Sequence, residues 1–135
     1  MNRKKQQLSY WLKLVGVLSV ICMATGCLTD EFKSIEITGI SLINSNDGRY
    51  EGVYETSLVK ATVQVVIQDH RIKDIQITRH ENGMGKKAEK IIARVIEKQT
   101  TNVDAISGAT ASSRVILKAI ENAVSKAETQ KGEIK

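Results

Sequence analysis

The sequence has little of several residue types, and each shortage excludes a class of function. Of its 135 residues, two are cysteines, none is proline and 4% are aromatic. Both cysteines, Cys22 and Cys27, lie in the first 27 residues. A domain that begins after them has no disulfide, no thiol catalysis and no Cys-bound metal, iron–sulfur cluster or haem. We therefore expect no metal site, and any redox chemistry of this domain needs an organic cofactor.

The basic excess is confined to the start of the chain. The net charge is +5, with 20 Lys and Arg against 15 Asp and Glu. Four of the basic residues and none of the acidic ones lie in residues 1–26, which leaves 16 against 15 in the rest. Nucleic-acid-binding proteins usually concentrate basic charge on the domain that binds. The charge distribution therefore argues against a nucleic-acid partner.

The first 26 residues have the organisation of an export signal. A basic start (MNRKKQQ) precedes an apolar stretch of 13 residues, which is shorter than the roughly 20 residues of a membrane-spanning helix. Residues 24–26 (ATG), directly before Cys27, resemble the lipobox of bacterial lipoproteins. That resemblance implies a signal peptide over 1–26 and acylation of Cys27, which would anchor the protein in the cell membrane, facing outside the cytoplasm. An uncleaved membrane anchor and a secreted protein without lipid are the alternatives.

The rest of the chain is long enough for one modest hydrophobic core. We expect the lipidated Cys27 and a tether over residues 27–40, a folded domain over 41–128 and a polar tail over 129–135. Alternating apolar residues predict strands at 34–43, 50–58, 61–68 and 72–78, the last two joined as an antiparallel hairpin.

Two amphipathic helices are expected after the strands. Apolar residues at three- and four-residue intervals place them at about 84–98 and 111–128. Strands followed by helices favour an α+β fold, in which a small antiparallel sheet carries two helices on one face. The sequence thus predicts a single α+β domain after a signal peptide.

Residues 100–110 (TTNVDAISGAT) form a hydroxyl-rich segment that opens onto the second helix. A helix N-terminus presents unpaired N–H groups and the positive end of the helix dipole, both of which suit a phosphate. Gly108 allows a close backbone approach, and the nearby hydroxyls are further donors. Ordinary helix capping by Ser or Thr is the alternative explanation. Neither GxxxxGK[ST] nor GxSxG is present.

Within this segment, residues 104–110 (DAISGAT) resemble the flavinylation motif of the FMN-binding domain family. That family includes covalently flavinylated subunits of Rnf-type and sodium-pumping NADH:quinone oxidoreductases, and small lipoproteins of extracellular electron transfer. Residues 47–52 (DGRYEG), the hairpin at 63–77 and residues 80–85 (HENGMG) resemble other family segments in the same order. The last of these is shorter than the family's H-x-E-T-P-G-L-G and lacks its proline.

The resemblance implies an FMN cofactor, joined through its phosphate to Thr110 by a separate flavin transferase. The cofactor contacts expected from the two motifs are Thr110, Ser107, Gly108, Ala109, Asp104, His80, Glu81, Met84 and Gly85. Ser112 and Ser113, which follow the second motif, are expected as further hydroxyl donors at the helix start. Alternatives stay open for several of them. Asp104 is either a recognition or metal-positioning residue during transfer or a solvated loop carboxylate. His80 and Glu81 are either close to the flavin or surface and capping residues, and Met84 is either a flavin contact or part of the core.

These features predict a membrane-anchored, extracytoplasmic electron carrier rather than an enzyme with its own substrate. Its expected partners are the transferase, a membrane redox complex or quinol oxidase-type donor, and an extracytoplasmic acceptor. Lys86, Lys87 and Lys90 form a basic cluster, which is either a solvated face or a contact for an acidic partner. Two other functions remain: a lipoprotein that binds FMN or another phosphorylated ligand non-covalently, as a sensor or scavenger, and a structural lipoprotein without flavin.

Overall fold

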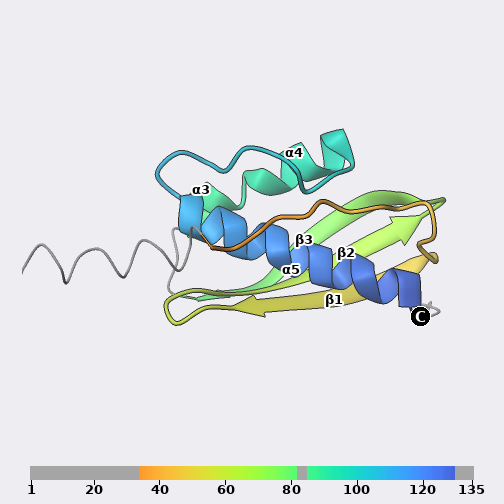
Figure 1. The fold of residues 1–135 in the computed structure, drawn as a ribbon, viewed down its shortest axis with the longest axis horizontal. Helices are drawn as coiled ribbons and strands as arrows, with labels where there is room; N and C mark the ends of the chain where they lie inside the picture. Colours follow the sequence, from red (N-terminus) through yellow and green to blue (C-terminus); the bar gives the residue numbers. More distant parts are fainter. Residues whose placement is uncertain (1–33, 82–84, 130–135) are drawn as a thin grey trace, which may run out of the picture. The chain divides into compact units, whose positions relative to one another are not determined.

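The computed structural model describes residues 34–81 and 85–129. The expected signal peptide (1–26), Cys27, Met84 and residues 130–135 lie outside these ranges. The elements lie in one compact unit that begins at Ile35. In chain order they are β1 (Gly48–Glu55), β2 (Lys60–Gln68), β3 (Arg71–Glu81), α3 (Gly85–Ala88), α4 (Ile91–Lys98) and α5 (Thr110–Thr129), as Figure 1 shows. Within the described ranges, no helix has the length and apolar composition of a membrane span.

The strands form one antiparallel sheet in the order β1-β2-β3. Tyr50 of β1 lies opposite Val65 of β2, which lies opposite Ile75 of β3, and all three side chains are buried. Along β2 the side chains alternate between half-buried and buried, as the two-residue period predicts. The α+β fold and the hairpin expected between residues 61 and 78 are confirmed.

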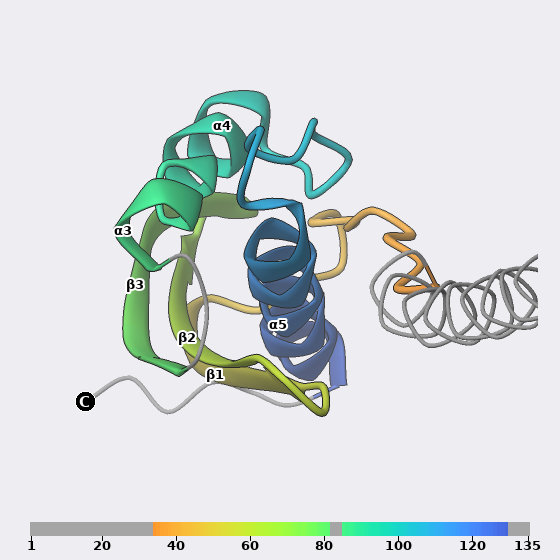
Figure 2. The ribbon, with the colours of Figure 1, turned by 90° about the vertical axis from the view of Figure 1, so that its left-hand side faces the viewer.

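α5 packs along one face of the sheet, over β1 and β2 (Figure 2). Gly52 of β1 makes this close packing possible, because a Cβ built there would lie 1.9 Å from the backbone oxygen of Ala119. Near the same point, the side-chain amide of Asn122 donates a 2.9 Å hydrogen bond to the backbone oxygen of Val53. The long helix therefore lies directly against the backbone of β1.

Side chains also bind backbone groups at both edges of the sheet. On β1, the ammonium group of Lys126 donates to the backbone oxygen of Glu51 at 2.7 Å. On β3, the amide of Gln99 bonds both backbone groups of Ile72, accepting from its N–H at 2.8 Å and donating to its oxygen at 3.0 Å. Gln99 follows α4 in a left-handed conformation with φ of 55°. It thereby takes the place of a neighbouring strand at one position.

The helix expected at 84–98 is interrupted in the structure. α3 ends at Ala88, a turn follows, and α4 begins at Ile91. α3 packs against α5, whereas α4 packs against β3. The apolar period does not reveal the break, because Ala88, Ile91 and Val95 are all fully buried and keep the same three- and four-residue spacing across it.

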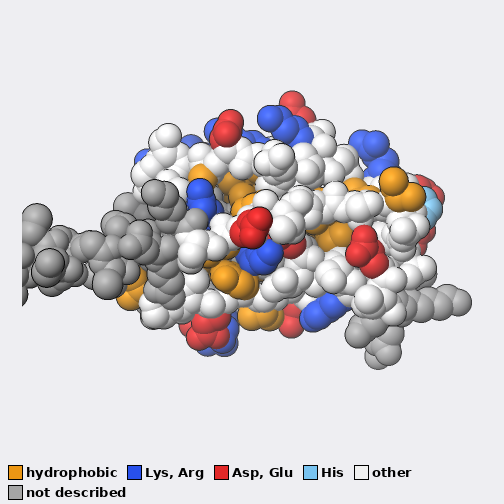
Figure 3. Space-filling view, in the orientation of Figure 1, with side chains coloured by type: hydrophobic (Ala, Val, Ile, Leu, Met, Phe, Trp, Pro, Cys, Tyr) orange, Lys and Arg blue, Asp and Glu red, His pale blue; other side chains and the backbone are white. Residues whose placement is uncertain are grey.

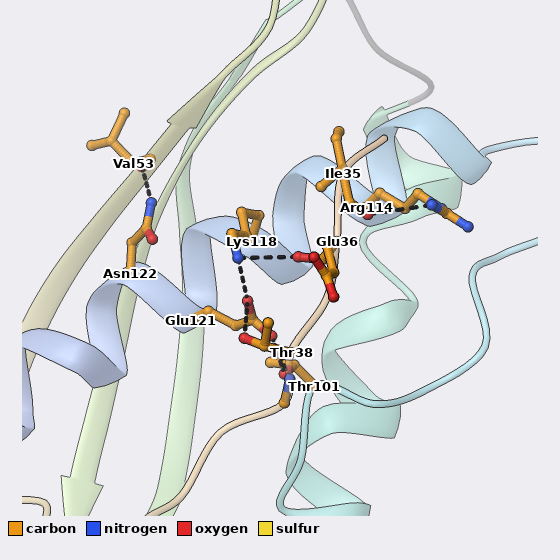
Figure 4. Close-up of polar contacts among 10 residues, drawn as sticks. Ile35, Glu36, Thr38, Val53, Thr101, Arg114, Lys118, Glu121 and Asn122 are labelled. Atoms are coloured by element: carbon orange, nitrogen blue, oxygen red, sulfur yellow. Dashed lines mark hydrogen bonds and ion pairs between the residues drawn. The ribbon is translucent and has the colours of Figure 1, made fainter. Parts of the chain in front are cut away.

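The strand expected at 34–43 is wrong, since this segment pairs with no strand of the described sheet. It runs instead along α5, where Ile35 and Leu42 are buried. Its backbone bonds go to α5 side chains, as Figure 4 shows: the oxygen of Glu36 accepts from Lys118 at 3.0 Å. The alternating pattern correctly predicted buried apolar residues, but these residues pack against a helix and not within a sheet.

Glu121 of α5 is the main anchor of this segment. Its side chain is 7% exposed and accepts from the backbone N–H of Gly39 at 2.8 Å and from the hydroxyl of Thr101 at 2.9 Å. Lys118 forms an ion pair with it at 2.9 Å, and the hydroxyl of Thr38 donates at 3.4 Å. A buried carboxylate needs such donors to offset its loss of water. Glu121 therefore joins the 35–43 segment, the loop before α5 and α5 itself.

The surface above α5 carries both signs of charge. Figure 3 shows acidic and basic side chains interspersed over the described part of this face, with apolar side chains between them. On this face, recognition by charge therefore depends on local groups rather than on a broad field of one sign.

Candidate functional site

The loop that precedes α5 ends in a tight turn at Ser107 and Gly108. The backbone N–H of Ala109 donates to the oxygen of Ile106 at 2.9 Å, which closes the turn. Gly108 has φ of +74°, a conformation that residues with a Cβ adopt only at a cost. A four-residue turn with positive φ at its third residue is the type II turn, which requires glycine there. The positive φ therefore explains why a glycine occupies this position of the SGAT string.

α5 begins immediately after this turn, with Thr110 as its first residue. The backbone N–H of Ser113 donates to the oxygen of Ala109 at 2.9 Å, which is the first hydrogen bond of the helix. The N–H groups of a helix's first turn have no partner within the helix. The side chain of Thr110 is exposed, and its hydroxyl makes no hydrogen bond within the described residues. Thr110 therefore presents a free hydroxyl at the positive end of a 20-residue helix.

The loop is fastened to the helix from inside. The hydroxyl oxygen of Ser113, which is fully buried, accepts from the backbone N–H of Ile106 at 3.1 Å. Ile106 and Ala109 are also buried, with 8% and 3% exposure. Ser112 is buried as well, at 2%. The structure therefore turns Ser112 and Ser113 inward and leaves Thr110 and Ser107 at the surface.

Asp104 lies at the outer side of the loop. Its side chain is exposed, and its backbone oxygen accepts from the guanidinium of Arg94 at 2.8 Å. Its carboxylate has no partner within the described residues, so it is accessible to another molecule. Across residues 34–81 and 85–129, no group of three or more His, Cys, Asp or Glu side chains gathers as a metal site.

α3 brings a cation to the turn. Lys87 lies in α3, which packs against α5, and the next residue, Ala88, is fully buried. A Cβ built on Gly108 would lie 2.7 Å from Nζ of Lys87, so the ammonium group lies directly over the turn. Lys87 forms no ion pair or hydrogen bond with any described residue. A cation without an anion therefore lies beside the loop that carries Thr110.

His80 and Glu81 are the last residues of β3, at the same end of the domain as α3 and the start of α5 (Figure 2). Both ring nitrogens of His80 are buried and have no hydrogen-bond partner among the described residues. Buried polar atoms without a partner are rare in folded proteins, so these nitrogens are candidates for contact with a bound group. Glu81 is half-buried and pairs with Arg79 at 2.6 Å. Gly85 begins α3 and has no side chain to contact a cofactor. Met84 lies outside the described residues.

The end of β3, α3 and the start of α5 lie at the same end of the domain (Figure 1), and α3 packs there against α5. His80, Lys87 and Thr110 therefore come from three different elements at this end of the domain. Sequence reasoning did not single out Lys87 from its basic cluster, and it missed Glu121 and Thr101. No local pattern marks these residues, because their partners lie far away along the chain.

Comparison with known proteins agrees with this geometry. The sequence model of the FMN-binding domain family matches residues 58–125, which contain β2, β3, α3, α4, the loop and most of α5. NADH:acrylate oxidoreductase of Vibrio harveyi is 33% identical over 85 residues, covering 61% of this chain and 8% of that much longer protein. The crystal structure of the CPE2226 protein from Clostridium perfringens has a TM-score of 0.53 and 24% identity, covering 66% of this chain and 93% of that one. That last likeness concerns the fold alone. The family match spans half of this chain, so the chain belongs to the FMN-binding domain family, and FMN is its cofactor.

Proposed function

We propose that FMN is attached to Thr110 through a phosphoester and that the domain works as an electron carrier. The observation that carries the proposal is the exposed, unbonded hydroxyl of Thr110 on the first residue of α5. Ser112 and Ser113, the other hydroxyls of this helix turn, are buried. Thr110 is therefore the hydroxyl of the helix start that an external enzyme can reach.

The residues around Thr110 fit the phosphate of FMN. A helix start presents N–H groups that have no partner within the helix, and the helix dipole favours an anion there. Charge-assisted hydrogen bonds to phosphate oxygens are shorter and stronger than neutral ones. The turn at Gly108 has no side chain to obstruct the phosphate. These features hold an anion in place without any movement of the backbone.

The attachment itself needs another enzyme. Activation of a hydroxyl requires an adjacent base, and the side chain that the structure places beside the turn at Gly108 is a lysine, Lys87. In the transfer, the Thr110 oxygen forms a bond to phosphorus while an anhydride bond of an activated FMN phosphate breaks. The hydroxyl proton passes to a base of the transferase, and the second phosphate group leaves. The exposed Asp104 carboxylate is available to the transferase or its metal ion.

Bound FMN supplies the redox chemistry, and the chain supplies attachment and orientation. His80 is a group of this chain that fits the flavin, because its buried ring nitrogens have no protein partner. The proposed setting is outside the cytoplasm, on a lipid anchor at Cys27. Electrons would come from a membrane redox complex or a quinol oxidase-type donor and go to an extracytoplasmic acceptor. A covalent bond prevents loss of the cofactor in such a setting.

Intact-protein mass spectrometry tests the attachment. The chain is produced with and without a flavin transferase, then denatured, precipitated and weighed. We expect a mass increase of one FMN less one water only with the transferase, lost in Thr110→Val and retained in the matched controls Ser107→Ala and Ser112→Ala. Flavin that washes out of the denatured wild-type protein would instead favour non-covalent FMN binding. An increment that persists in Thr110→Val would refute the acceptor assignment.

The anchor is tested separately. Full-length protein with Cys27→Ser is expected to lose its membrane association while keeping the FMN increment. Cell fractionation followed by the same mass measurement distinguishes the two properties. Wild-type protein that leaves the membrane fraction as readily as Cys27→Ser would refute the lipid anchor without affecting the assignment of Thr110.

A further inference from the structure

We propose that the ammonium group of Lys87 binds the phosphate of the FMN on Thr110. This inference rests on the proposed attachment and adds a residue that neither motif contains. It assigns to one lysine of the basic cluster at 86–90 a role as the counter-charge of the bound cofactor. Lys87 is a positioning residue in this proposal, because it touches the phosphate and not the flavin ring.

The first support is position. A Cβ built on Gly108 would have Nζ of Lys87 at 2.7 Å and Cε at 3.8 Å, and no other atom beyond the chain neighbours lies within 4 Å. Gly108 and Thr110 are separated by two Cα–Cα steps of about 3.8 Å each. A lysine on its four-carbon stem easily covers that separation. The ammonium group is therefore within reach of a phosphate on the Thr110 oxygen.

The second support is the packing of the element that carries Lys87. α3 packs against α5, and Ala88, the next residue, is fully buried. The side chain of Lys87 is exposed, and its ammonium group lies at the surface beside Gly108. The φ of +74° requires glycine at position 108, and the absence of a Cβ there leaves room for the ammonium group of Lys87 beside the turn.

The third support is charge. Lys60 pairs with Glu55 at 2.8 Å, and Lys118 pairs with Glu121 at 2.9 Å. Lys87, like Lys86 and Lys90 of its cluster, forms no ion pair among the described residues, but it is the lysine whose ammonium group lies beside Gly108. A phosphodiester on Thr110 carries one negative charge and would give this ammonium group an anionic partner. The ammonium group then adds a full positive charge to the partial charge of the helix start.

A comparison of loaded and unloaded protein tests the proposal. Wild type, Lys87→Met, Lys87→Arg and the matched control Lys86→Met are each prepared with and without FMN, and the loading is verified by intact mass. The measured quantity is the rise in Tm on loading. We expect Lys87→Met to lose most of the wild-type rise, whereas Lys86→Met and Lys87→Arg keep it. Added salt should reduce the wild-type rise by more than it reduces the Lys87→Met rise, because only the wild type has the full charge of the ammonium group beside the phosphate.

The outcomes separate this proposal from the proposed attachment. Equal rises in loaded wild type and loaded Lys87→Met would overturn the role of Lys87 while the mass increment upholds the attachment. Wild type without an increment would overturn the attachment itself. A lower Tm of unloaded Lys87→Met would show a structural role and overturn the pairing. Lys87→Met could also fail to accept FMN although its unloaded form has the wild-type Tm and Lys86→Met loads fully. This result would support the role of Lys87, because the same ammonium group meets the phosphate during transfer.

Discussion

The backbone N–H of Ile106 donates to the hydroxyl oxygen of Ser113 across seven residues, at 3.1 Å. This bond fastens the loop before α5 to the helix that follows it. Because Ser113 is fully buried, the bond is shielded from water. The exposed Thr110 lies in sequence between Ile106 and Ser113, so the bond between these two residues also restricts the position of Thr110.

Ser113→Ala is expected to destabilise the unloaded protein by about 1–3 kcal/mol, because it leaves the buried N–H of Ile106 without a partner. The free energy of unfolding in urea measures the effect. The exposed Ser107, in the same loop, provides the control, and Ser107→Ala should stay within about 0.5 kcal/mol of wild type. Equal stabilities of the two variants would mean that the bond does not hold the loop.

Gly52→Ala is expected to destabilise the protein by about 1–3 kcal/mol or more, because its Cβ would overlap the backbone of α5 at Ala119. Gly39→Ala is an informative comparison, since nothing lies within 4 Å of its Cβ but its φ is +85°. It should cost about 1–2 kcal/mol through the left-handed conformation alone. Thermal unfolding of both variants checks the order. A Gly52→Ala protein as stable as wild type would contradict the close packing of α5 on β1.

Glu121→Leu is expected to release the 35–43 segment, because it leaves the N–H of Gly39 and the hydroxyl of Thr101 without their acceptor. Each unpaired buried group costs about 1–3 kcal/mol. Hydrogen exchange should show faster exchange at Gly39 than in wild type. Glu128→Leu, on the exposed side of the same helix, should leave exchange there unchanged. Unchanged protection of Gly39 in Glu121→Leu would show that the segment is held by other contacts.

His80→Leu is expected to leave the stability of the unloaded protein unchanged or raised, because it removes two buried nitrogens that have no partner. In the FMN-loaded protein the same change should shift the visible absorption of the flavin, if the imidazole meets the ring. Thr78→Leu, at an exposed position of the same strand, is the control and should leave the spectrum unchanged. A destabilised unloaded His80→Leu protein with a wild-type spectrum would give His80 a purely structural role.

Much of the sheet and the last helix could be predicted from the sequence. The two-residue alternation of Val63, Val65 and Ile67 and the helical spacing around Ile116 and Ile120 each correspond to a face that is buried in the structure. Local patterns report whether a side chain is buried. They do not report what buries it, and for that reason the 34–43 segment was expected in the sheet although it lies on α5.

The candidate site also has features that the sequence predicted and features that it did not. Thr110 at a helix start and Gly108 in a turn follow from a short string of residues, and the structure agrees with both positions. The inward direction of Ser113 depends on its bond to Ile106, and the place of Lys87 depends on how α3 packs against α5. A local sequence pattern predicts neither the direction of Ser113 nor the place of Lys87, because both depend on packing between separate segments.

The two outer strands of the sheet have one further consequence for a protein that works beside others. Glu51 of β1 and Ile72 of β3 have their outward backbone groups bound by Lys126 and Gln99. A neighbouring polypeptide that tried to extend the sheet would have to displace these side chains first. At these two positions, the addition of a strand from a neighbouring copy of the domain is therefore less favourable than at an edge whose backbone groups are unbound.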